Sequence, residues 1–171
     1  DDDGQYIFKA IAVASPGGLG KSDYYDVNET LDNDQDMKFL DVMRHSSSYD
    51  RISYQYTSYF EDIFDFIVPC IDYHLKTRDS YANALPLVFL EILSKLPDTH
   101  ITRKLGNKIA KKTSNEANDL LKILVKDDSQ ERGRKLLEKL DYKYKKNRIN
   151  PGTTADLLVA GLMIHKIFKS E

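Results

Sequence analysis

Apolar residues recur every three or four positions along most of this chain, which is the spacing of one face of an α-helix. The stretch 49–76 shows this rhythm over several turns, with apolar side chains at Ile52, Tyr56, Tyr59, Ile63, Phe66, Ile67, Cys70, Ile71 and Leu75. No alternating run is bounded by a two-residue Asn-Gly or Asp-Gly turn, so strands are not expected. The chain has 171 residues, enough for one domain with a real core. We therefore predict a single all-α domain over residues 1–171, a bundle of about six to eight helices.

Several helix starts and breaks can be placed on this pattern. Pro69 lacks a backbone donor and is expected to kink the helix of 49–76. Ser80 is suited to cap the next helix, and Pro86 lies near enough to its first turn not to stop it. Further helices are expected at about 37–44, 120–125, 136–140 and 154–168.

Composition and charge exclude several classes of partner. The formal net charge is -2, which gives no attraction to nucleic acid or to anionic membranes. The single cysteine, Cys70, cannot form an internal disulfide and is expected to be a buried thiol. The chain has no CxxC and no paired His/Cys spacing of the zinc type, and its apolar stretches are too short to span a membrane. Because no secretory signal opens the sequence, we expect a cytoplasmic protein without nucleic-acid or membrane partners.

The first of three polar segments is SPGGLGK, residues 15–21, within a long connection that suggests function or mobility. Gly17, Gly18 and Gly20 allow backbone N–H groups to face an anion, and Lys21 adds a positive charge. The segment is not a Walker P-loop, because that spacing requires a glycine where Ser15 stands. A helix C-cap followed by an ordinary loop is the alternative.

The second polar segment is PDTHITRKLG, residues 97–106. Asp98 or Thr99 can cap a helix that Gly106 ends, and the side chains at 100, 103 and 104 then share roughly one side. A carboxylate, a hydroxyl, an imidazole and two cations could together hold a metal–phosphate group. The alternative is an ordinary solvated helix face.

The third polar segment is NPGTTADLL, residues 150–158, at the start of a strongly apolar stretch. Asn150 can cap a helix that begins at Pro151, or Thr153 can cap it with Asp156 completing a capping box. Such a helix start offers backbone N–H groups to a phosphate. A carboxylate at the same place favours a phosphate that carries Mg²⁺, so Asp156 is either part of a cap or a metal ligand that points into a cleft.

Aromatic side chains precede two carboxylates in the stretch 54–62. The aromatic residues are Tyr54, Tyr56, Tyr59 and Phe60. They could stack on a nucleotide base, although at helical spacing they more often belong to the core. Glu61 and Asp62 follow directly, and an acidic residue on the inner face of a helix would suggest a site.

Taken together, these segments resemble the triphosphoribosyl-dephospho-CoA synthase family. Four motifs are similar to those of the family and stand in the same order: 15–20 with 26–27, 59–64, 98–106 and 150–158. The resemblance implies an all-α enzyme that joins ATP to 3'-dephospho-CoA. In that reaction the 2'-hydroxyl of dephospho-CoA attacks ribose C1' of ATP, and adenine leaves. Such a glycosyl transfer needs a clamp for the Mg²⁺-triphosphate, a group that assists the departure of adenine and a base for the hydroxyl.

The resemblance also implies roles for residues of this chain. Asp98, Asp156 and Glu61 are the candidate catalytic carboxylates, and Asp98 and Asp156 are also the candidate ligands of Mg²⁺. The candidate nucleotide-binding residues are Gly17, Gly18, Gly20, Lys21, Thr99, Arg103, Lys104, Gly152, Thr153 and Thr154. If this hypothesis holds, the three polar segments converge on one cleft, whereas independent helix caps would be scattered.

Members of the family are considerably longer than this chain. They carry N-terminal motifs, a Pro-Lys-Pro-Gly-like loop among them, that are not found here. The resemblance therefore covers almost the whole of this chain, most weakly between 107 and 147, but only the C-terminal half or somewhat more of the family's length. The polypeptide is truncated, or a second chain supplies the missing part, or this is a reduced homologue; a homo-oligomer is also open. The rival hypothesis is a non-catalytic helical domain that binds a nucleotide or a partner subunit.

Overall fold

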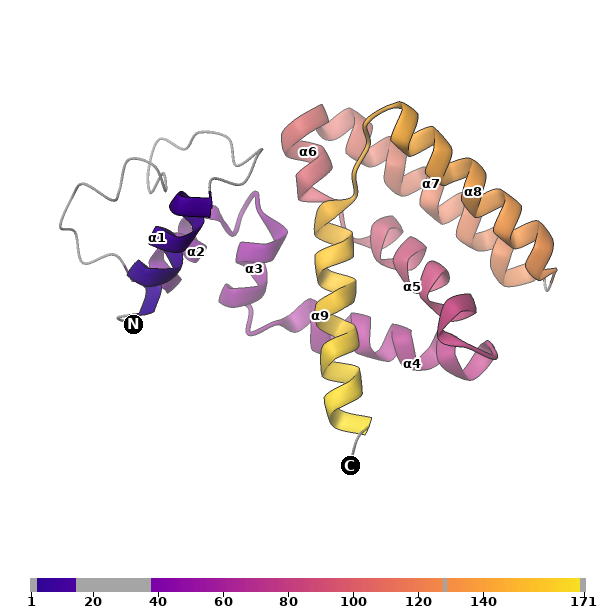
Figure 1. Ribbon diagram of the computed structural model, residues 1–171, viewed down its shortest axis with the longest axis horizontal. Coiled ribbons are helices and arrows are strands. Elements are labelled where there is room, and N and C mark those ends of the chain that lie inside the picture. Colours follow the sequence, from indigo (N-terminus) through magenta and orange to yellow (C-terminus); the bar gives the residue numbers. More distant parts are fainter. Residues whose placement is uncertain (1–2, 15–37, 128, 170–171) are drawn as a thin grey trace. The chain divides into compact units, whose positions relative to one another are not determined.

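The computed structural model describes residues 3–14, 38–127 and 129–169 of the chain. Every regular element in this part of the chain is a helix, with nine α-helices and one π-helix (Figure 1). The predicted all-α fold is confirmed, with slightly more helices than expected. The chain forms two compact units, Asp1–Tyr59 and Phe60–Glu171, and the single domain stays a prediction.

The first unit contains three described helices, α1 (Asp3–Ala14), α2 (Phe39–Ser46) and α3 (Arg51–Thr57). Aromatic rings connect them. Phe39 of α2 stacks on Phe8 of α1 with ring centroids 5.9 Å apart, and it meets Tyr56 of α3 edge-on at 5.0 Å. Asp50 caps α3 by accepting hydrogen bonds from two backbone N–H groups of its first turn.

The second unit contains the π-helix and six α-helices: η2 (Asp62–Ile67), α4 (Val68–Thr77), α5 (Tyr81–Lys95), α6 (Thr99–Leu105), α7 (Asn107–Lys126), α8 (Gln130–Lys146) and α9 (Gly152–Lys169). Helices α7 and α8 lie side by side and are joined by an ion pair between Lys143 and Glu116 (Figure 1). Helix α5 packs against both α4 and α7. Helix α9 packs against η2, α4, α5 and α6. Apart from Phe8, every buried hydrophobic side chain of the described residues belongs to this unit. The core that positions the polar segments of α6 and α9 is therefore the core of the second unit.

The expected single helix over 49–76 is wrong, because the chain breaks it before Pro69. Tyr59 and Phe60 have positive φ angles of 56° and 62°, which end one helical segment and begin another. The π-helix η2 follows, and the N–H of Val68 donates to the carbonyl of Ile63, five residues back. η2 runs directly into α4, and Ile67 at the junction is itself helical, so Pro69 lies inside a continuous helical stretch, just after the π-helix, where its missing N–H interrupts the hydrogen-bond ladder.

The expected cap of the helix after Ser80 and its continuation past Pro86 are confirmed. Ser80 caps α5 by accepting a hydrogen bond from the N–H of Asn83 at 3.3 Å, and α5 continues past Pro86. The last helix begins at Gly152, two residues earlier than expected. The assignment of Tyr59 to the core is wrong, since this side chain is 88% exposed.

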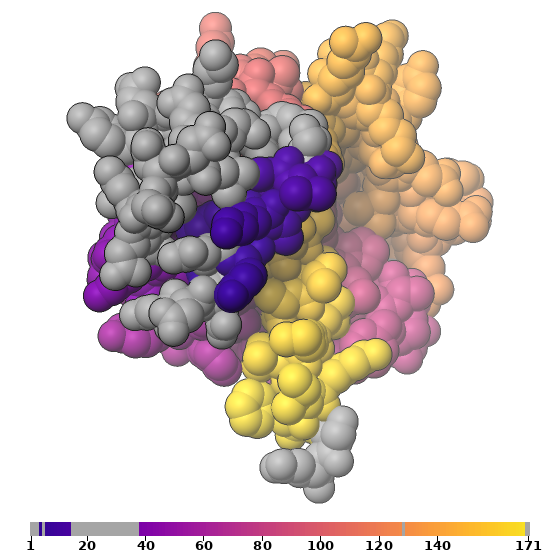
Figure 2. Space-filling view, turned by 60° about the vertical axis from the view of Figure 1, so that its left-hand side comes forward, coloured from indigo at the N-terminus to yellow at the C-terminus, as the bar shows by residue number. Residues whose placement is uncertain are grey.

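The C-terminal half of α9, in yellow, forms part of the surface shown in Figure 2. Val159, Met163 and Ile167 follow one another at four-residue spacing along α9, and all three are exposed. None of the described helices combines the length and the apolar composition needed to cross a membrane.

Candidate functional site

Two of the predicted polar segments meet where α6 and α9 begin (Figure 1). Asp98 lies between the two helix starts and is only 1% exposed. Its Oδ1 accepts from the N–H of Ile101 at 2.9 Å and so caps its own helix, α6. Its Oδ2 accepts from both the N–H and the Oγ1 of Thr154, at 2.9 and 2.8 Å. One buried carboxylate thus binds the first turns of two helices.

Thr153 of α9 in turn caps the first turn of α6. Its Oγ1 accepts from the backbone N–H of His100 at 3.1 Å and forms a hydrogen bond with Oγ1 of Thr99 at 3.0 Å. Each helix therefore supplies a cap to the other. We call Asp98, Thr99, His100, Thr153 and Thr154 the helix-start cluster.

The expected caps of α9, Asn150 or Thr153 with Asp156, are corrected by this arrangement. The carbonyl of Pro151 accepts the first helical bond from Ala155, and the carbonyl of Asn150 accepts from Gly152 at 2.9 Å. The side-chain cap comes from Asp98, which lies 56 residues from Thr154 in the sequence. Because the N–H of Thr154 already donates to Asp98, it is not available to donate to a phosphate, as the sequence had suggested for this helix start.

Gly152 is required by the close approach of the two helix starts. A Cβ atom added there would lie 3.2 Å from Nδ1 of His100 and 3.3 Å from its Cγ. These contacts are tighter than ordinary van der Waals contact, so the imidazole ring packs directly on the glycine backbone.

The electrostatics of His100 also connect the two segments. Burial of the ring lowers the pKa of His100 below its ordinary value of 6.5, and the charges of Lys104 and Arg103 lower it further. The carboxylates of Asp98 and Asp156 oppose this shift, so both act on the same imidazole. The ring is therefore neutral at pH 7, and its Nε2 is buried without a hydrogen bond within the described residues.

The remaining charged candidates of these two segments face solvent. Arg103, Lys104 and Asp156 are all exposed. Buried hydroxyls and the buried Asp98 thus hold the two helix starts together, while the charged side chains lie at the surface.

The other predicted site residues are those of the glycine-rich segment and Glu61. Gly17, Gly18, Gly20 and Lys21 lie outside the described residues. Glu61 is exposed at the residue that precedes η2. The neighbouring carboxylate, Asp62, is the buried one, at 8% exposure, although sequence reasoning selected Glu61. Helical spacing alone could not decide between adjacent residues, because the break at 59–60 shifts the inward face.

Two buried polar clusters were missed by sequence reasoning. In the first, Nε2 of His74 lies 2.8 Å from Oε2 of Glu91, and Cys70 lies beside the same carboxylate. Burial raises the pKa of the Cys70 thiol to about 12, and the charge of Glu91 adds to this effect. The expected buried thiol is confirmed. Glu91 lies on α5, whereas Cys70 and His74 lie on α4, so the spacing of residues along the sequence could not predict this cluster.

The second missed cluster joins α4 to α9. Nε2 of the buried His165 lies 3.1 Å from Oδ1 of Asp72, which also forms an ion pair with Lys169. The hydrogen bond from Lys169 and that from His165 lower the pKa of Asp72. This cluster contains a histidine, a carboxylate and a lysine but no thiol.

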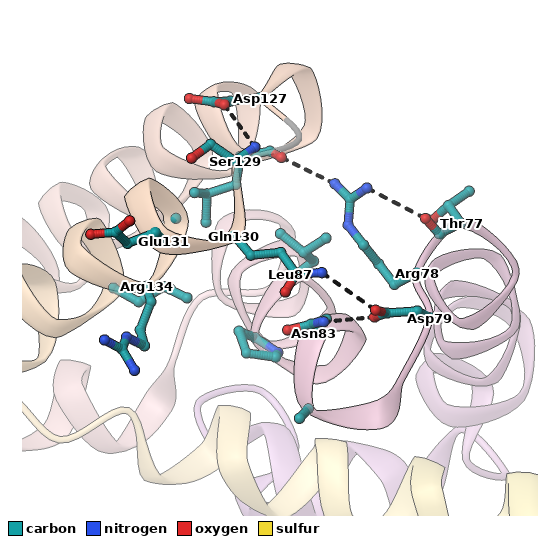
Figure 3. A pocket seen from close by; sticks show the side chains of 15 residues that line it. Thr77, Arg78, Asp79, Asn83, Leu87, Asp127, Ser129, Gln130, Glu131 and Arg134 are labelled. Atoms are coloured by element: carbon teal, nitrogen blue, oxygen red, sulfur yellow. Dashed lines mark hydrogen bonds between the residues drawn. The ribbon is translucent and has the colours of Figure 1, made fainter.

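An open pocket of about 900 Å³ lies at the beginning of α5, beneath the start of α8 (Figure 3). Asp79 on its wall accepts hydrogen bonds from Asn83 at 2.6 Å and Gln130 at 3.3 Å. The helix-start cluster lies beyond the opposite end of α5, a helix of about 20 Å in length. The pocket is therefore separate from the predicted site.

Fold and site define an all-α protein in which two cross-capped helix starts carry exposed charged side chains. Over residues 1–171 the chain matches the CitG family, described as ATP:dephospho-CoA triphosphoribosyl transferase, and it belongs to this transferase family. A comparison with curated proteins found no match. A comparison with solved structures found none.

Proposed function

We propose that this protein transfers the triphosphoribosyl group of ATP to the 2'-hydroxyl of 3'-dephospho-CoA and releases adenine. The observation that carries the proposal is the family match over all 171 residues. The helix-start cluster supports it, because it brings together two segments, 98–106 and 150–158, that resemble motifs of that family.

The reaction sets clear demands on side chains. The bond between ribose C1' and the adenine nitrogen breaks, and a bond between C1' and the acceptor oxygen forms. The acceptor hydroxyl loses a proton, and the departing adenine gains one. In this proposal Asp156 and Glu61, both exposed carboxylates, are the candidates to accept or supply these protons. Lys104 and Arg103 are exposed on the first helix of the cluster and balance the charge of the triphosphate.

The residues present fit Mg²⁺, the ion that the substrate ATP implies, but they fit it unequally. Mg²⁺ prefers carboxylate and phosphate oxygens, and when bound it would neutralise the charge of the triphosphate. Asp156 has an exposed carboxylate and suits this role. Asp98 is buried and already accepts three hydrogen bonds, so in this proposal it positions the helix starts instead of binding metal directly.

Replacing Asp156 by asparagine tests the proposal. Because the amide is nearly isosteric and the side chain is exposed, Asp156→Asn should keep the fold and its melting temperature. We expect Mg²⁺-dependent ATP binding to weaken by about 1–3 kcal/mol, or about 5- to 150-fold in Kd. Titration calorimetry with ATP and Mg²⁺ measures the affinity, and chromatography of ATP plus 3'-dephospho-CoA reactions measures released adenine.

The matched control is Asp141→Asn on α8, an exposed carboxylate paired with Lys145 outside the site. It changes the net charge equally and should leave affinity and adenine release unchanged. A lowered melting temperature with unchanged ATP affinity in Asp156→Asn would reduce Asp156 to a structural role. ATP binding by the native protein without any adenine release would favour the alternative, a nucleotide-binding or subunit-interaction domain.

A further inference from the structure

A set of side chains of the types that bind metal ions joins α4 to α5 and shares no residue with the helix-start cluster. Cys70 and His74 stand four residues apart on α4 and so share one face, and Glu91 reaches them from α5. One ligand atom from each of the three lies within 4.8 Å of the other two. Cys70 and His74 are 7% and 2% exposed, and the Glu91 side chain is 19% exposed. We call these three residues the thiol cluster.

We propose that the thiol cluster is a binding site for Zn²⁺ or a similar borderline-soft divalent ion. Sulfur, imidazole nitrogen and carboxylate oxygen are the donors that such ions prefer, and three protein ligands leave a fourth tetrahedral position for water or another ligand. A thiolate and a carboxylate together balance the two positive charges of the ion, which lowers the free-energy cost of burying the complex.

The geometry requires only small side-chain movements. Bonds of about 2.0–2.3 Å to a tetrahedral ion place its ligands about 3.5 Å apart. Separations that now reach up to 4.8 Å must shorten by roughly 1 Å, and the 2.8 Å between Nε2 of His74 and Oε2 of Glu91 must lengthen by less than about 1 Å. On binding, the sulfur–metal bond forms as the Cys70 thiol releases its proton to solvent. Nε2 of His74 donates to the carboxylate of Glu91 in the metal-free protein, so its proton must move to Nδ1 before Nε2 can bind the ion.

Lys95 is the group that competes with the ion. Its Nζ lies 2.7 Å from Oε1 of Glu91 and supplies the positive charge that a metal ion would replace. The ammonium group also lies 4.7 Å from the centre of the Phe66 ring, so it has a second favourable contact to keep when the ion binds.

The chain contains its own matched control. His165, Asp72 and Lys169 repeat the arrangement of His74, Glu91 and Lys95, but no thiol accompanies them. A metal effect that came from any histidine–carboxylate pair would appear at both places. An effect that requires the thiol cluster would appear only at the first.

Cobalt substitution of the whole, chelator-treated protein tests the proposal. Because Cys70 is the single cysteine, a thiolate-to-cobalt charge-transfer band can arise from no other residue of this chain. We expect such a band with one Co²⁺ per chain, its loss on adding Zn²⁺, and no change with excess Mg²⁺. No band at all, or one Co²⁺ shared by two chains, would overturn the proposal whatever the result with ATP.

Variants then locate the ligands. Cys70→Ala should abolish the band, and His74→Gln should weaken Zn²⁺ binding by more than about 100-fold, the upper range for losing a mere supporting group. His165→Gln should leave both unchanged. Lys95→Met removes the competing charge and should tighten binding, by about tenfold. Circular dichroism checks that each variant is folded. If a ligand variant does not fold, the charge-transfer band of the native protein and the metal affinity of Lys95→Met still test the proposed site.

Discussion

Asp98 shows how one side chain can serve two helices. Its three hydrogen bonds join Ile101 of α6 and Thr154 of α9, and all of them end on a carboxylate that is almost fully buried. A buried carboxylate is costly unless such donors surround it, because it has lost the hydrogen bonds of water. The residue that the sequence suggested as a metal ligand is therefore first of all a link between helix starts.

We predict that Asp98→Asn destabilises the protein by about 3 kcal/mol, the scale of losing a hydrogen bond to a buried charged group. Ile101 donates to Oδ1 and Thr154 donates to Oδ2, and the substitution replaces one of these oxygens by an NH2 group that cannot accept. Thr154→Val removes one of the three donors and should cost less, roughly 1–2 kcal/mol. Urea unfolding measures both, with Asp141→Asn as the exposed control. Equal decreases in the free energy of unfolding of the two variants would show that the hydrogen bond from Ile101 to the shared carboxylate adds nothing to the stability.

At the scale of elements, the approach of α9 to η2 and α4 depends on a glycine. A Cβ atom at Gly161 would lie 2.5 Å from Cγ2 of Ile67 and 3.3 Å from Cδ1 of Ile71. The Cγ2 atom is fixed directly to a β-branched carbon in a fully buried side chain, so it cannot swing aside. The site at the start of α9 is thus held by close packing further along the same helix.

We predict that Gly161→Ala lowers the free energy of unfolding by about 1–3 kcal/mol, since overpacking outweighs the gain in helix propensity. Gly133 of α8 provides the matched control. Among the described residues, a Cβ atom there would meet only Cδ2 of Leu124, at an ordinary 3.4 Å. Gly133→Ala should therefore stabilise the protein by about 0.5–1 kcal/mol. Denaturation curves that move in the same direction for both variants would contradict the packing argument.

For the whole molecule, the distribution of buried side chains separates the two units. Among the described residues, Phe8 is the one buried hydrophobic side chain outside Phe60–Glu171. A core that joins α5, α7 and α8 lies entirely within the second unit. This unit also contains the helix-start cluster and the thiol cluster.

We predict that residues 60–171 expressed alone fold into a helical protein that unfolds cooperatively, because their buried core does not require the first unit. Circular dichroism during urea unfolding measures this, with the full chain as reference. A broad, non-cooperative transition would show that the first unit is needed for folding.

The sequence by itself determined the features that depend on neighbouring residues. Helical spacing, the Ser80 cap, the Asp98 cap of α6 and the end of α6 at Gly106 all follow from residues within a turn or two. Gly106 has a φ of 84°, a conformation that glycine adopts without a steric cost. The family motifs at the starts of α6 and α9 could also be recognised in the sequence, since each is a short continuous segment.

Only the tertiary structure decided which distant groups share a hydrogen bond. The second role of Asp98 depends on Thr154, 56 residues away, and the thiol cluster depends on Glu91 from a neighbouring helix. The break at Tyr59 and Phe60 likewise decided that Asp62, and not Glu61, is buried. Apolar periodicity specifies which face of a helix is buried but not which polar groups it meets there, because that choice depends on how the helices cross.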